Sequence, residues 1–217
     1  MRPINLKQFL PCLFLLVAVT SFSNSVRGQS EYGIEINLLQ PTGRFGHVFK
    51  AAPGLRITKS FSDTDKAFQF RSFIGVFNFS PRRDTVNVGW YDGSNPSSQS
   101  NNRVFIGSQE IHKRNLYFTL GTQVMYRPFI DQALRPYAVF EIQGMYGVID
   151  REIISVEGSL DEGGGDGGAG VGGGIGVEYL TEGNFTFYLN IIRSYNFSAA
   201  HDGFVYWNSA LGVMYLF

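Results

Sequence analysis

The most constraining feature of this sequence is a period-two alternation of apolar residues with polar or small ones, in segments of about ten residues. In the first segment Ile34 and Ile36 fall on one face, while Glu35 and Asn37 fall on the other. Successive side chains of a β-strand point to opposite faces, so each such segment predicts a strand with one apolar face. The pattern recurs at eight places: residues 32–38, 55–58, 68–77, 115–126, 137–148, 170–179, 184–191 and 208–217.

The connections between these segments alternate in length. Two are long and polar or acidic, residues 81–104 and 150–168, whereas residues 62–66 and 181–183 form short ones. The connection at residues 128–136 is longer than ideal. Transmembrane barrels have long loops outside the cell, short periplasmic turns and an even number of strands. We therefore predict an all-β fold, an eight-stranded antiparallel up-and-down transmembrane β-barrel with a closed interior filled by side chains.

Two segments are less regular than the others. Residues 55–58 follow Pro53, and Phe73 and Phe77 fall on the otherwise polar face of residues 68–77. A β-bulge in the latter segment would reset the alternation.

A soluble β-sandwich or lipocalin-like barrel is the alternative fold, with the apolar faces turned inward. Its exterior would then carry the row Gly170, Gly172, Gly174 and Gly176. Small residues fit the lumen of a narrow barrel better, because they leave room for larger neighbours. Aromatic girdles at the bilayer boundary would also account for the residues at the ends of the apolar faces, which are Tyr32, Tyr126, Tyr179, Tyr215 and Phe217.

The N-terminus has the order of a secretory signal peptide. Arg2 and Lys7 precede an apolar run at residues 9–22, and small or polar residues follow up to Gly28. A membrane anchor is the alternative, but the run is shorter than the ~20 residues that a spanning helix needs. We expect cleavage between Gly28 and Gln29, which leaves residues 29–217 as one barrel domain in the outer membrane. The only cysteine, Cys12, would be removed with residues 1–28.

Five charged residues fall on the non-apolar faces of the predicted strands. Charges inside a barrel are costly unless they are paired. Two arginines and three glutamates can form such a network, so we predict a charge network in the lumen. Its members are Glu35, Arg56, Arg71, Glu141 and Glu178.

Two glycine-rich motifs point only weakly to ligands. Residues 165–170 fit the G-x-G-x-x-G pattern, but period-two alternation follows instead of the helix that a dinucleotide site needs. Asp161, Glu162 and Asp166 would supply oxygen ligands for calcium, but their spacing is not that of an EF-hand. A solvated acidic loop is the favoured interpretation, and we expect no cofactor.

The histidines suggest no strong chemistry. His47, His112 and His201 lack the spacing of a metal site. His201 and Asp202 lie near Ser198, which leaves a lipid-modifying hydrolase as an alternative function. We expect no catalytic residue and no metal site.

Three stretches carry a family resemblance: the strand start Pro136-Tyr137-Ala138, the glycine-alternating residues 170–179, and the ending at residues 212–217. From residue 31 onward the chain resembles the small outer-membrane β-barrel proteins of Bacteroidota, a group that includes PorT-like chains. The resemblance implies contact with outer-membrane lipid and lipopolysaccharide, and recognition by the barrel assembly machinery. The residues similar to the terminal assembly signal are Leu211, Val213, Tyr215 and Phe217. A final apolar strand without that role is the alternative.

The formal net charge of zero gives no basic signature for nucleic acid binding. We therefore expect a non-enzymatic membrane protein with a structural, adhesive or accessory role, whose extracellular loops contact a protein partner. An accessory subunit of a secretion or gliding assembly is the second possibility, and it follows only from the PorT-like resemblance.

Overall fold

The computed structural model describes residues 31–61, 66–82, 85–91, 105–155, 158–198 and 203–217. Within them the chain forms nine antiparallel strands and one short helix, α2 (Gly43–Val48). None of the helices in this part of the chain is long and apolar enough to cross a membrane. The strands are β1 (Glu31–Pro41), β2 (Ala52–Ser60), β3 (Phe68–Asn78), β4 (Thr85–Tyr91), β5 (Phe105–Tyr126), β6 (Leu134–Ser155), β7 (Gly158–Leu180), β8 (Phe185–Ser198) and β9 (Phe204–Leu216).

The strands close into a barrel whose wall has eight strands. All consecutive strands pair except β3 and β4, β1 pairs with β9, and the pairing of β3 with β5 completes the ring. β3 pairs with residues 116–126 of β5, and β4 pairs with residues 105–111 of the same strand. β4 thus lies on the same side of β5 as β3, beyond the end of β3. The predicted all-β, eight-stranded antiparallel barrel is confirmed.

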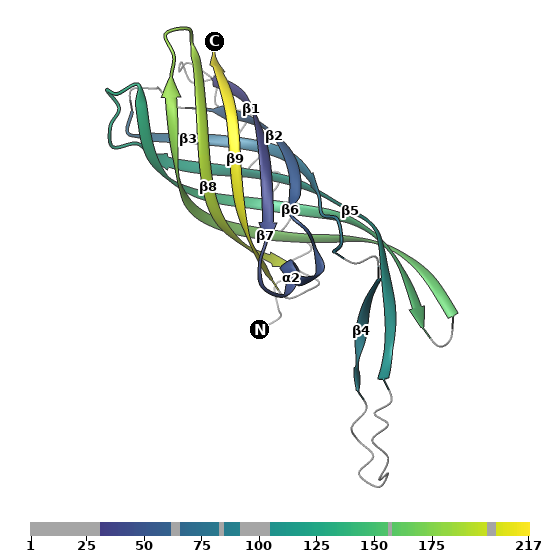
Figure 1. Ribbon diagram of the computed structural model, residues 1–217. Coiled ribbons are helices and arrows are strands. Elements are labelled where there is room, and N and C mark those ends of the chain that lie inside the picture. The colour runs from purple at the N-terminus through teal and green to yellow at the C-terminus, as the bar shows by residue number, and fades with distance from the viewer. Residues whose placement is uncertain (1–30, 62–65, 83–84, 92–104, 156–157, 199–202) are drawn as a thin grey trace, which may run out of the picture.

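The two ends of the barrel differ (Figure 1). At the terminal end lie the start of β1 and the end of β9, which pair from Glu31 with Leu216. At the opposite end, called here the α2 end, α2 lies across the barrel, and two hairpins extend past it. One hairpin joins β4 to β5, and the other joins β6 to β7.

The prediction of a loop at residues 150–168 is wrong. β6 and β7 remain paired from Leu134 with Tyr179 to Ser155 with Gly158. The ladder satisfies the backbone groups of this glycine-rich stretch, which a loop would leave to solvent. The prediction for residues 81–104 is wrong in part, because β4 occupies residues 85–91 and residues 92–104 lie outside the described chain.

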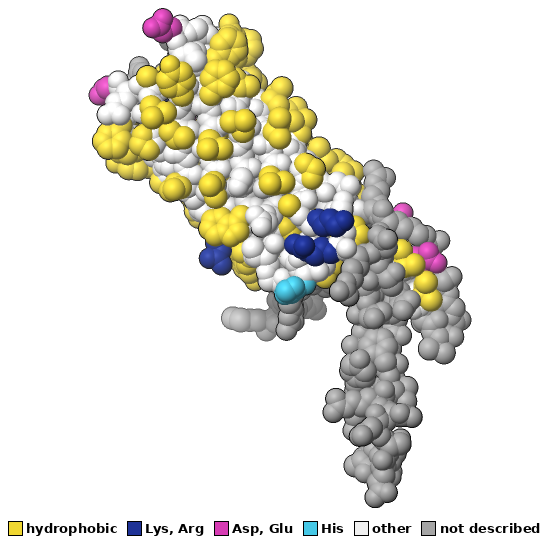
Figure 2. All heavy atoms as spheres, viewed as in Figure 1, with side chains coloured by type: hydrophobic (Ala, Val, Ile, Leu, Met, Phe, Trp, Pro, Cys, Tyr) yellow, Lys and Arg dark blue, Asp and Glu magenta, His cyan; other side chains and the backbone are white. Residues whose placement is uncertain are grey.

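The outer surface is apolar and the interior is polar. Ile34 is 56% exposed whereas its neighbour Glu35 is fully buried, and the same alternation follows each described wall strand. On the face that Figure 2 shows, hydrophobic side chains are spread over the barrel wall.

The bulge considered for β3 is absent. Its pairings with β2 and β5 run without a shift, and Phe73 and Phe77 both point into the barrel. Aromatic residues on the inward face, and not a change of register, explain the irregular pattern.

Candidate functional site

The charged residues buried in the barrel form the candidate site. Among the described residues, four glutamates and four arginines are buried there, so their formal charges balance. Burial of such groups is costly unless the charges are paired. They are Glu31, Glu35, Glu141, Glu178, Arg56, Arg71, Arg127 and Arg135.

Arg56 joins two carboxylates from different strands. Its Nη1 lies 3.1 Å from Glu141 Oε2 and 3.4 Å from Glu35 Oε1. Its guanidinium carbon lies 4.1 Å from the centre of the Phe73 ring, a cation–π arrangement. Arg56 on β2 therefore links β1, β3 and β6 across the lumen.

Both carboxylates receive further hydrogen bonds. The Tyr188 hydroxyl donates to Glu35 Oε2 at 3.1 Å, and the Asn37 amide donates to Glu35 Oε1. Gln123 Nε2 donates to Glu141 Oε2 at 2.8 Å. The lone pairs that Arg56 leaves open are thus partly satisfied, as a buried ion pair requires.

Glu178 belongs to a second cluster, nearer the terminal end. Its Oε1 accepts a hydrogen bond from Arg127 Nη1 at 3.0 Å, and Arg127 Nη2 also donates to the backbone oxygen of Lys66 at 2.9 Å. Glu31 Oε2 accepts from Gln69 Nε2 at 3.2 Å. Arg135 Nε donates to the backbone oxygen of Gln132 at 2.8 Å.

Arg71 lies inside the barrel but forms none of these ion pairs. Its guanidinium carbon stacks 4.1 Å from the centre of the Tyr188 ring. Among the described residues, none accepts a hydrogen bond from its three side-chain nitrogens. Tyr188 bonds to Glu35 in turn, so it stands between Arg71 and the Arg56 cluster. The five predicted lumen residues are thus all inside, distributed over two ion-pair clusters and one stacked arginine.

Sequence analysis missed Arg127, Arg135 and Glu31. Arg127 lies one residue beyond the predicted segment 115–126, on its inward register. Glu31 precedes the segment 32–38 in the same way, and Arg135 precedes residues 137–148 on their inward register. Extending each alternation by one or two residues beyond the end of the predicted segment, in either direction, would have found all three.

Glycines make room for the large inward side chains. A Cβ atom at Gly176 would overlap the Tyr137 ring, and one at Gly212 would overlap the Tyr188 ring. Gly121 stands against Phe73 in the same way. The pairing of a large residue with a glycine on a neighbouring strand fills the narrow lumen.

At the α2 end an aromatic group, called here the mouth cluster, replaces the charges. Phe45 stacks on Phe204 at 4.2 Å between ring centres and meets Phe79 edge-on at 5.2 Å. The segment that carries α2 is held by a 2.8 Å bond from Thr42 N to the Val205 backbone oxygen. The members of the cluster are Phe45, Phe49, Phe77, Phe79, Tyr117, Phe204 and Tyr206.

Sequence analysis did not predict α2 or the mouth cluster. The available signal was the four-residue spacing of Phe45 and Phe49, which places both on one face of a helix. The second signal was the run of inward phenylalanines at 73, 77 and 79.

The other motifs gather no chemical site in the described part of the chain. Residues 165–170 lie within β7, with no helix following them. His47 is exposed on α2, and His112 lies in β5. Where described, no group of three or more histidine, cysteine or acidic residues is placed to hold a metal.

The structure does not describe the side chains of the remaining predicted residues. His201, Asp202 and the predicted signal peptide lie outside the described residues. Ser198, Asp161, Glu162 and Asp166 lie on described strands, but their side chains are not described.

Comparison with known proteins identifies the fold. No family model matches the sequence, and no curated protein is similar to it. Neisserial surface protein A superposes with a TM-score of 0.57 at 11% identity, over 87% of this chain and 97% of that one. A major outer membrane protein of Thermus thermophilus gives 0.45 at 13% identity, over 87% and 99% of the two chains. The attachment invasion locus protein Ail of Yersinia pestis gives 0.43 at 13% identity, over 87% and 97%. The chain therefore has the fold of the small eight-stranded outer-membrane β-barrels.

Proposed function

We propose that this chain is an integral outer-membrane protein without enzymatic activity, in a structural, adhesive or accessory role. In this proposal the α2 end faces the cell exterior, and the β4–β5 and β6–β7 hairpins are offered there to a partner. The observation that carries the proposal is the inverted distribution of polarity, with isoleucine and leucine outside and paired charges inside. A continuous apolar wall is stable in lipid, and a closed barrel leaves no unpaired strand edge there.

Aromatic side chains at both ends of the wall support the membrane placement. At the terminal end Tyr32 contacts Phe217, with 5.6 Å between ring centres, and Phe185 contacts Tyr215 at 5.0 Å. Toward the α2 end Tyr195 and Phe197 are 4.6 Å apart. Aromatic girdles of this kind mark the two lipid boundaries of transmembrane barrels.

The last strand supports recognition by the barrel assembly machinery. Leu211, Val213, Tyr215 and Phe217 all point outward, where an assembly factor would meet them before the barrel closes. Cleavage after Gly28 and export remain part of the proposal.

Fractionation tests the location. We expect the protein in the outer-membrane fraction, with a gel mobility that changes on boiling, because a closed barrel resists detergent until heated. Recovery as a soluble periplasmic protein would contradict the proposal.

Leu189 and Asn190 test the orientation of the wall. Leu189 is 48% exposed and points outward, whereas Asn190 is buried inside. We expect Leu189→Arg to lower the free energy of unfolding by roughly 2–4 kcal/mol if the residue lies near the bilayer midplane. As the matched control, a cysteine at 189 should react with a lipid-soluble reagent and a cysteine at 190 should not. Equal labelling would refute the assignment.

Two other functions compete with this one. An accessory role in a secretion or gliding assembly rests on the PorT-like resemblance of the sequence, and a pull-down from native membranes that recovers such an assembly would favour it.

A lipid-modifying hydrolase would release acyl chains from membrane lipid, and Ser198→Ala would abolish the release. The proposal of a non-enzymatic protein expects no release from either form.

A further inference from the structure

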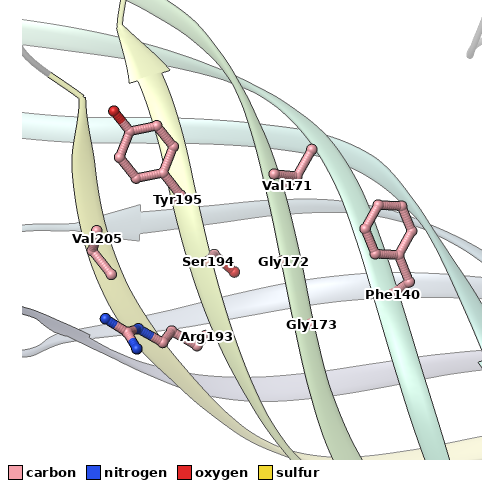
Figure 3. A pocket seen from close by; sticks show the side chains of 8 residues that line it. All are labelled: Phe140, Val171, Gly172, Gly173, Arg193, Ser194, Tyr195 and Val205. Carbon is pink, nitrogen blue, oxygen red and sulfur yellow. The ribbon is translucent and has the colours of Figure 1, made fainter.

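The outer wall contains a groove where β7 lacks a side chain. On one row of the wall, Gly173 pairs with Phe140 of β6 on one side and Arg193 of β8 on the other. Arg193 in turn pairs with Trp207 of β9. The resulting groove has a volume of about 420 Å³. Figure 3 shows Gly172 and Gly173 between Phe140 and Arg193, with Tyr195 and Val205 beside the arginine.

Packing within the protein does not require glycine at position 173. A Cβ atom there would have Val139 O, 4.0 Å away, as its nearest neighbour. At the inward positions on either side, Gly172 and Gly174, a Cβ atom would overlap β8. Gly173 also interrupts the outward apolar series that includes Val171 and Ile175. The missing side chain therefore leaves space on the lipid-facing wall and not in the lumen.

Arg193 gives the groove a positive charge. It is exposed on the outer wall, between Ile191 and Tyr195 along β8. Its guanidinium carbon lies 5.7 Å from the centre of the Trp207 ring, and among the described residues no carboxylate pairs with it. A charge that faces lipid is costly unless an anion or the headgroup layer receives it.

Arg193 lies just inside the border of the apolar wall, two residues before Tyr195 of the aromatic pair Tyr195 and Phe197 on β8. On β1 the outward series runs from Tyr32 to Leu38 and then changes to Gln40. Gln40 pairs with Trp207, so it lies in the same row as Arg193. This border is on the α2 side, which the proposed orientation places in the outer leaflet.

We propose that this groove binds a phosphorylated glycolipid of the outer leaflet, of the lipid A type. Arg193 receives a headgroup phosphate, for which the guanidinium has a suitable fork of donors. An acyl chain lies over Gly173, between Phe140 and Val171. The inference rests on the proposed membrane location and adds a defined lipid site to it.

The test measures lipid binding to the purified, heat-modifiable barrel in detergent by native mass spectrometry. The probes are bisphosphorylated lipid A, dephosphorylated lipid A and inorganic phosphate. We expect Arg193→Gln to weaken binding of the bisphosphorylated lipid about tenfold, the loss of a charge-assisted phosphate contact. Gly173→Leu should weaken binding of both lipids, because its side chain occupies the groove and its Cβ atom meets no protein atom closer than 4.0 Å.

Two matched variants serve as controls. Lys59→Gln removes an outward cation at the terminal end, where Lys59 Nζ lies 5.3 Å from the centre of the Tyr32 ring. Ile175→Phe enlarges an outward side chain two residues from Gly173. Both should bind lipid A as the unmodified protein does.

Three results would overturn the lipid site: unchanged binding by Arg193→Gln, equal binding of the dephosphorylated lipid by the unmodified protein, or displacement of the lipid by inorganic phosphate alone. Heat-modifiable protein that binds no lipid A would remove the site and leave the outer-membrane proposal intact. Failure of the proposed location would instead appear as soluble protein without heat modification.

Discussion

Toward the terminal end and the centre, the barrel interior holds ion pairs, whereas the α2 end holds the mouth cluster. Arg56 with Glu141, and Arg127 with Glu178, are separated by 3.1 and 3.0 Å. At the α2 end, Phe77 and Tyr117 stack at 5.6 Å between ring centres. The interior of one barrel is therefore filled by ion pairs in one region and by aromatic contacts in the other. The energies of these two kinds of contact depend differently on geometry.

The difference teaches how each region specifies the fold. A buried charge is stable only in one arrangement of partners, because an unpaired charge in a low dielectric is costly. Aromatic rings gain from burial in several tilted or edge-on arrangements. The charged region therefore specifies register, and the mouth cluster closes one end of the barrel with the short helix α2.

The largest effect should follow from breaking the central ion pairs. Arg56→Met leaves Glu35 and Glu141 without their cation, which we expect to cost roughly 3–5 kcal/mol of unfolding free energy in a dry lumen. Denaturant titration of the barrel refolded in vesicles measures it. Adding Glu141→Gln to the variant should recover part of the loss. A single variant as stable as the unmodified protein would show that water screens the interior.

The mouth cluster should respond less strongly. Phe79→Ala removes a ring that is buried and contacts Phe45, Phe77 and Tyr117. Large-to-small changes of this kind cost about 3 kcal/mol at the low end, and α2 can settle into the space. The same titration measures it, and Phe129→Ala on the exposed surface is the matched control. Equal losses for the two variants would contradict the role of the cluster.

The smallest effect should come from the hydrogen bond that joins Tyr188, on which Arg71 stacks, to Glu35 of the Arg56 cluster. Tyr188→Phe keeps the ring that stacks on Arg71 and removes only the hydroxyl that donates to Glu35. Because Asn37 and Arg56 still donate to Glu35, we expect a loss of about 1 kcal/mol. A loss as large as that of Arg56→Met would mean that the hydroxyl, and not the arginine, holds Glu35.

Hydropathy alternation was enough to predict the wall, because the strand period and the contrast between lipid and lumen act on each segment locally. It also placed Glu35, Arg56, Arg71, Glu141 and Glu178 on inward faces. Alternation could not predict which charges pair, because partners across a lumen depend on the stagger of all strands. Glu178, for example, pairs with Arg127, which was not among the predicted arginines. Inward phenylalanines such as Phe73 misled it, since hydropathy does not distinguish an apolar residue in the lumen from one facing lipid.

Ionic conductance of the unmodified protein in a planar bilayer tests the central claim most directly. The paired charges, the rings seated over glycines and the mouth cluster together fill an eight-stranded interior that side chains can just occupy. We predict no stable open channel at any holding potential that the bilayer tolerates. A stable, ion-selective conductance from the purified unmodified barrel would contradict the filled interior and identify the protein as a small pore.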